Sequence, residues 1–81
     1  MTIDHRTRIF PTHAETVTKS DSTTFNPSAI VVLVSGDIKV QPAGGGSPIV
    51  FSGWPAFVAL PVMCTMVYST GTTATGIIRS Y

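Results

Sequence analysis

Short runs of apolar residues between turn-forming residues are typical of β-strands in the middle of this chain. Residues 29–34 (AIVVLV) are apolar at every position, which predicts a strand buried on both faces. Residues 37–41 (DIKVQ) alternate between polar and apolar, which predicts a strand with one face in solvent. The small residues 42–48 (PAGGGSP) predict a hairpin loop, after which residues 49–51 (IVF) return along the sheet.

The remainder of the chain continues as two turns and three strands. Residues 52–55 (SGWP) and 70–76 (TGTTATG) are rich in glycine and small polar residues, which predicts turns. Strands are expected over residues 57–62, 63–69 and 77–81. No window carries apolar residues at the spacing of an amphipathic helix.

These elements predict an all-β fold, a small antiparallel β-sandwich or barrel with an extended N-terminal arm. Valine, isoleucine and threonine are abundant, and their branched side chains suit a pleated surface better than a helix. The β domain is expected over residues 29–81, because residues 1–28 are rich in threonine and charge and end at an Asn-Pro turn. The sheet edges need partners, so either this arm pairs with an edge, its own or a neighbour's, or another subunit's strand does.

The length makes assembly the expected source of stability. A chain of 81 residues forms one small domain that buries only about 60–65% of its unfolded surface. Cys64 is the single cysteine, so a disulfide within the chain is impossible. His5 and His13 lie far from Cys64 in sequence, so no metal is expected either.

The distribution of charge also favours assembly. Of the nine Asp, Glu, Lys and Arg residues, only Asp37, Lys39 and Arg79 lie beyond residue 21. A soluble monomer of this size normally covers about a quarter to a third of its surface with charge, so the exposed faces are expected either to consist of Thr, Ser and Gly or to be covered by another subunit. The net charge of +1 and the lack of a basic run argue against nucleic acid or a membrane surface as a partner.

No targeting segment is predicted. The first ten residues mix acids and bases without an apolar stretch behind them, unlike a signal peptide. The longest apolar-leaning run, residues 54–68, contains two prolines and is shorter than the ~20 residues needed to span a bilayer. The chain is therefore expected to be soluble and made in the cytoplasm, where a single reduced cysteine is usual.

Neither an enzyme nor a cofactor-binding protein is expected. The run Gly44–Gly46 lacks the Lys-Ser/Thr pair and the following helix of a phosphate-binding loop. Cys64 has no neighbouring base and is expected to be a buried, inert thiol. Asp37 is the only carboxylate of the predicted domain and is expected to cap the turn at residues 35–37. No catalytic residue, cofactor site or metal site is therefore assigned, and His5, His13, Asp4 and Glu15 are interpreted as polar residues of the arm.

Five segments in a fixed order resemble a known family of virion proteins. They are SDSTTF (20–25), SGDIKVQPAGGG (35–46), IVF (49–51), LPV (60–62) and VYSTGTTATGI (67–77). Their order and spacing are similar to those of the small head spike-base proteins of tailed phages and gene-transfer agents. Two departures, Met63 and Thr65 in place of basic residues and SGWPA (52–56) in place of a polar turn, make this chain more apolar than the family pattern.

The resemblance implies a non-enzymatic bacteriophage protein of the virion. Members of that family oligomerise on the outer capsid surface, as decoration or cement proteins or as the base of a spike. The implied partners are the major capsid protein, further copies of the chain in a trimer or pentamer, and a spike or fibre protein. A tail or head–tail connector component and a soluble ligand-binding β-module remain as alternatives.

Arginine and aromatic residues dominate the energetics of interfaces and are therefore the candidate contact residues. In the arm, Arg6, Arg8 and Phe10 are expected to contact the capsid. In the domain, Trp54, Phe57 and Met63 are expected to pack between subunits.

Overall fold

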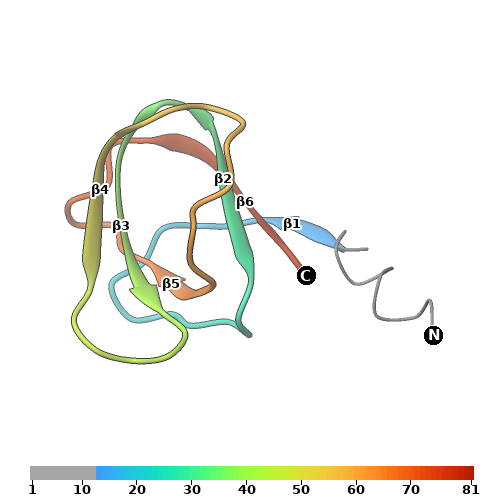
Figure 1. Ribbon diagram of the computed structural model, residues 1–81, viewed down its shortest axis with the longest axis vertical. Helices are drawn as coiled ribbons and strands as arrows, with labels where there is room; N and C mark the ends of the chain where they lie inside the picture. Colours follow the sequence, from blue (N-terminus) through green and yellow to red (C-terminus); the bar gives the residue numbers. More distant parts are fainter. Residues whose placement is uncertain (1–12) are drawn as a thin grey trace.

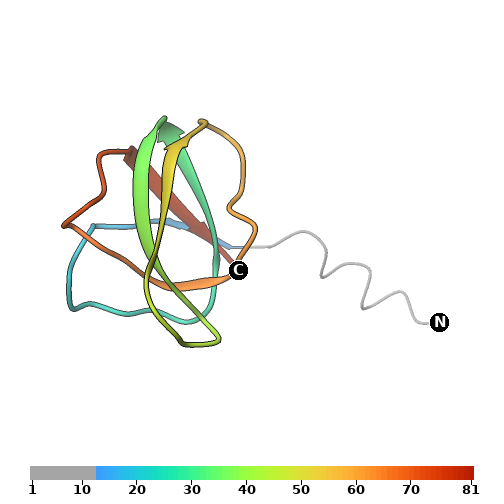
Figure 2. The same ribbon diagram turned by 60° about the vertical axis from the view of Figure 1, so that its left-hand side comes forward.

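A computed structural model describes residues 13–81, which form two three-stranded antiparallel sheets around one core (Figure 1). The strands are β1 (Ala14–Thr16), β2 (Ala29–Val34), β3 (Gly36–Pro42), β4 (Ile49–Trp54), β5 (Cys64–Val67) and β6 (Thr75–Ser80). One sheet has the order β1-β6-β2 and the other the order β4-β3-β5. Figure 2 shows β3 and β4 lying across β2 and β6 as two layers. The predicted all-β, antiparallel fold class is confirmed.

Alternation of buried and exposed residues generates the core. Ile38 and Val40 of β3 are fully buried, as their alternation with polar residues predicts. Strand β2 also alternates, with Ile30 and Val32 buried, whereas its last two residues, 33 and 34, are 44% and 56% exposed. The prediction that β2 is buried on both faces is wrong, because only its inner face packs against the second sheet.

The chain passes from one sheet to the other at Ser35, between β2 and β3. Residues 35–37 therefore form a corner between two nearly continuous strands, where a turn was predicted. At Gly36 the neighbouring backbone is so close that a Cβ atom would lie 2.8 Å from the amide nitrogen of Ala74 and 2.9 Å from Oγ1 of Thr73. Glycine is needed here for close approach, which brings β3 against the segment that leads into β6.

Residues 57–62, predicted as a strand, are irregular, while β4 continues through the turn predicted at 52–55. The irregular segment still runs beside β2 (Figures 1 and 2), where the amides of Phe57 and Leu60 donate to the carbonyls of Val32 and Ile30 at 2.8 and 2.9 Å. Proline at position 61 lacks an amide proton and limits regular pairing. The segment covers the outer edge of β2 without joining the sheet as a strand.

Residues 13–28 of the expected arm lie along both sheets. Strand β1 pairs with β6, with Glu15 opposite Arg79, so this part of the arm pairs with the chain's own sheet. Further along, the amides of Ser20 and Phe25 donate to β5 carbonyls, and Ser28 forms a bridge with Cys64. Residues 20–28 therefore cover the outer edge of β5.

Replacement of Gly36 by alanine should destabilise the fold. The new Cβ atom would collide with backbone, which cannot move aside cheaply, so we expect a loss of about 1–3 kcal/mol in the free energy of unfolding. Gly44→Ala is the matched control, because no atom lies within 4 Å of the Cβ it would add. Urea denaturation of both variants measures the difference, and equal midpoints would contradict the close approach at the corner.

Candidate interaction surface

Residues 13–81 contain no group of side chains suited to metal binding, and their one cysteine is buried. No three His, Cys, Asp or Glu residues of this range lie together in a way that could hold a metal ion. Cys64 is buried as predicted, and desolvation raises the pKa of its thiol to about 11. The thiol therefore stays protonated at neutral pH, where a thiolate nucleophile is not available. Within the same residues, no helix has the length and apolar character to cross a membrane.

The candidate functional region is the outer surface, where several large apolar side chains face solvent. Phe57 is the most exposed of them, at 74%, and its φ of 66° places it in the left-handed region. A residue with a Cβ atom rarely adopts this conformation. The other large apolar residues that are exposed in the described range are Leu33, Val34, Ile49, Val50, Val58, Met63 and Tyr81.

The loop that carries Phe57 is held from both sides. The indole Nε1 of Trp54 donates to the carbonyl of Val58 at 2.7 Å, and the Trp54 ring packs edge-on against Phe51 with centroids 5.3 Å apart. On the other side, the amide of Phe57 donates to the carbonyl of Val32 in β2. The backbone around Phe57 is thus fixed while its ring points outward.

The structure brings together two of the three residues expected at a subunit interface. Trp54 is the last residue of β4 and Phe57 lies in the loop that follows it, beside the exposed end of β2. Met63 is also exposed, but it precedes β5, where its carbonyl accepts a hydrogen bond from Ala43 of the hairpin loop. Sequence reasoning missed Leu33, because its continuous apolar run is indistinguishable from that of a strand buried on both faces.

Two of the four sheet edges have no partner among residues 13–81. The edges of β2 and β5 are covered by residues 57–60 and 20–28. No described residue pairs with the outer edge of β4 or of β1. Open edges of this kind present unpaired amide and carbonyl groups to an incoming strand.

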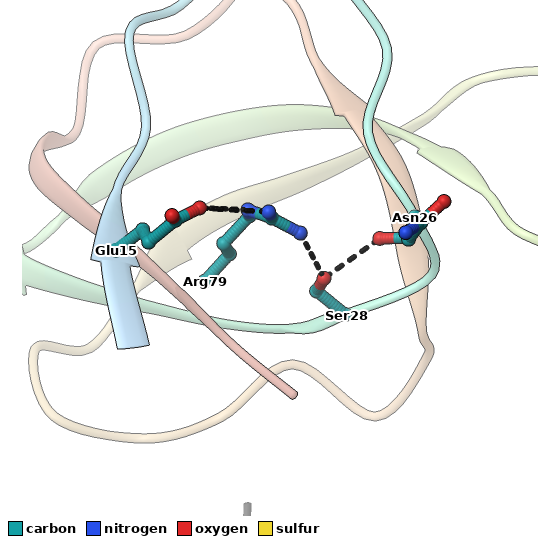
Figure 3. Close-up of polar contacts among 4 residues, drawn as sticks. All are labelled: Glu15, Asn26, Ser28 and Arg79. Atoms are coloured by element: carbon teal, nitrogen blue, oxygen red, sulfur yellow. Dashed lines mark hydrogen bonds and ion pairs between the residues drawn. The ribbon is translucent and has the colours of Figure 1, made fainter. Parts of the chain in front are cut away.

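A single arginine fixes one of these edges. Arg79 lies on β6 between β1 and β2, and its Nη2 donates to Oε1 of Glu15 at 2.7 Å (Figure 3). Its Nη1 donates to Oγ of Ser28 at 2.9 Å, and that buried hydroxyl donates to the carbonyl of Asn26. The guanidinium group therefore connects β1 to the segment that covers β5.

Arg79 points toward the core and not toward solvent. It stands opposite the buried Ile30 in the pairing with β2, and facing residues of an antiparallel pair share one side of the sheet. Its guanidinium lies over the rings of Phe25 and Tyr81, at 5.1 and 4.2 Å from the centroids. In the sequence, the one sign that Arg79 has a special role is its position in an apolar strand.

The side-chain carboxylates of Asp21 and Asp37 also bind backbone groups of distant segments. Asp21 accepts hydrogen bonds from the amides of Ser69 and Thr70 and from the Thr70 hydroxyl, which hold the pKa of its carboxyl below the usual value. Asp37 accepts from the amide of Gly53 on β4 at 2.8 Å. The expectation that Asp37 caps its own turn is therefore wrong, because the corner brings its carboxylate to the neighbouring strand.

The expected capsid-contact residues Arg6, Arg8 and Phe10 lie outside the described residues. Comparison of the sequence with models of protein families and with curated proteins gives no match. The function of this chain must therefore be inferred from the geometry of residues 13–81 and from the order of its sequence segments.

Replacement of Arg79 by lysine should destabilise the domain more than loss of its ion pair would. Lysine cannot bind Glu15 and Ser28 together through a planar fork, so we expect a loss of about 1–3 kcal/mol in the free energy of unfolding. Glu15→Gln is the matched control, because Glu15 is 55% exposed and an exposed pair contributes about 0–1 kcal/mol. Thermal unfolding of both variants provides the measurement, and an equal effect of the two would contradict the connecting role of Arg79.

Proposed function

We propose that this chain is a structural protein of a bacteriophage virion, a capsid decoration, cement or head spike-base protein that homo-oligomerises on the outer capsid surface. It acts by adhesion, and its partners are the major capsid protein and further copies of itself. Arg6, Arg8 and Phe10 contact the capsid in this proposal, while Trp54 and Phe57 pack between subunits.

The observation that carries the proposal is the exposed Phe57 ring on a loop that hydrogen bonds hold on both sides. The left-handed conformation of a residue with a Cβ atom costs roughly 1–2 kcal/mol. Exposure of the ring adds to that cost, because apolar surface in water is unfavourable. Aromatic side chains held in this way are the usual anchors of protein interfaces. The loop is therefore better explained by a partner that buries the ring than by the stability of the isolated domain.

The contacts of the charged side chains support the same function. Every Asp, Glu, Lys and Arg of residues 13–81 contacts another part of the domain, namely Glu15, Lys19, Asp21, Asp37, Lys39 and Arg79. Few charged groups therefore remain unpaired on the surface, so electrostatic repulsion between neighbouring copies is weak. Such a surface suits a protein that is covered by other subunits.

Three of the five segments that resemble the spike-base family include strands of the fold, and the other two, residues 20–25 and 60–62, lie in irregular chain. Residues 35–46 form β3 and the start of the hairpin loop, residues 49–51 begin β4, and residues 67–77 connect β5 to β6. These segments thus supply the corner and one of the open edges. The resemblance and the open edges both support a protein whose role is to assemble.

Co-sedimentation with capsids tests the function. The full chain is mixed with particles of its phage or gene-transfer agent that lack it, and its mass in solution is determined by native mass spectrometry. We expect a trimer or pentamer that sediments with the particles. Phe57→Asn should weaken oligomerisation at least tenfold without loss of fold, because asparagine tolerates φ of 66°, whereas Phe57→Tyr should retain it.

A wild-type chain that is monomeric and stays in the supernatant would overturn the proposal and favour a ligand-binding module. The number of copies bound per particle separates the virion alternatives. Hundreds of copies support decoration of the shell, whereas about a dozen would support a connector.

A further inference from the structure

The outer edge of β4 exposes a defined set of backbone groups. Tyr68 donates to the carbonyl of Lys39, so Lys39 of β3 faces β5, and its neighbours Ile38 and Val40 face β4. Hydrogen bonds alternate along an antiparallel pair, so the β4 residues opposite them bond to β3. The amide and carbonyl groups of Val50 therefore point outward.

A bulge interrupts the alternation between Gly36 and Ile38, opposite residues 52 and 53. The carbonyl of Phe51 and the amide of Gly53 both point toward β3, the latter to the Asp37 carboxylate. Across the two trans peptides, the amide and carbonyl of Ser52 therefore also point outward. None of the outward groups of Val50 and Ser52 has a partner among residues 13–81.

The outer edge of β1 exposes an equal set. The amide of Val17 donates to the carbonyl of Ile77, so residue 15, two positions earlier, also faces β6. The amide and carbonyl groups of Ala14 and Thr16 then point away from the sheet and have no partner in the described range. Both edges thus offer two donors and two acceptors, on alternate residues.

We infer that β4 of one copy pairs with β1 of the next copy, in the homo-oligomer on which the proposed function rests. In an antiparallel arrangement Val50 meets Thr16 of the next copy and Ser52 meets its Ala14. Four backbone hydrogen bonds then satisfy all the outward groups of both edges. The exposed side chains of Ile49 and Val50 lie on this edge and become buried in the pairing.

A second copy of the chain is the favoured partner for the edge of β4, because the chain itself contains a strand with the backbone groups that this edge requires. The occupant must be an extended backbone with an unpaired edge, and β1 is one. Strand β4 has no charged residue, and the one charged residue of β1, Glu15, is paired with Arg79 of its own sheet, so the two edges meet without an unpaired charge. In a trimer or pentamer each subunit uses two different surfaces, and the two unlike open edges meet that requirement.

Proline substitutions test the pairing without disturbing the domain. Proline at position 50 or 16 removes an outward amide proton and leaves the hydrogen bonds to β3 or β6 in place. Val50→Pro and Thr16→Pro should each weaken oligomerisation at least tenfold, because the proline ring also blocks the approaching strand. Val50→Thr is the matched control and should assemble as the wild type does. Circular dichroism checks that each variant is folded, and Ser52→Pro and Ala14→Pro replace any that is not.

The decisive experiment mixes the two proline variants. A Val50→Pro copy keeps an intact β1 edge and a Thr16→Pro copy keeps an intact β4 edge, so one productive contact remains between them. Native mass spectrometry should show two monomeric variants that form a one-to-one complex when mixed.

Two results would overturn the pairing. If Thr16→Pro still oligomerises alone while Val50→Pro does not, β4 pairs with β4 of another copy or with a different partner. If both variants oligomerise as the wild type does, neither edge is used, although a wild-type oligomer that sediments with capsids would leave the proposed function intact. A wild-type chain that neither oligomerises nor sediments would instead reject that function as well.

Discussion

The need to pair backbone groups at the edges of short sheets is the constraint on which this fold depends. Two three-stranded sheets have four edges, and unpaired edges attract other strands. Residues 57–60 and 20–28 cover the edges of β2 and β5 through a few backbone hydrogen bonds each. Neither covering segment is a regular strand, so residues 13–81 close two edges with irregular chain and leave the outer edges of β1 and β4 without a partner among themselves. The open edges explain how so small a domain can be one part of a larger assembly.

Arg79 connects an open sheet edge to a segment that covers another edge. On the inner face of β6 the sequence passes from buried Ile77 to Arg79, so the apolar core ends at a guanidinium group. That group binds Glu15 of β1 and Ser28 of the segment that covers β5. The same side chain therefore positions one open edge and one covering segment. A hydrophobic residue at this place would extend the core but would orient neither of them.

The sequence predicts the parts of the fold that depend on local pattern. The alternation in β3 and the hairpin loop that follows it were predicted correctly, because each depends on neighbouring residues. The exposure of Leu33 was not predicted, because a continuous apolar run does not show which face of the strand lacks a covering layer. The contacts of Arg79 with Glu15 and of Asp37 with Gly53 join residues far apart in the chain, and no local pattern encodes them. Of the candidate interface, the loop of Trp54 and Phe57 was predicted from residue type, whereas the open edges required the strand order.

Amide hydrogen exchange tests the pairing of the open edges most directly, because it reports on the individual backbone groups of both strands. If β4 and β1 pair between copies, the amides of Ala14, Thr16, Val50 and Ser52 exchange slowly in the oligomer and become fast when dilution produces monomers, while the buried amides of β3 stay protected in both. Fast exchange at these four positions in the intact oligomer would contradict the pairing.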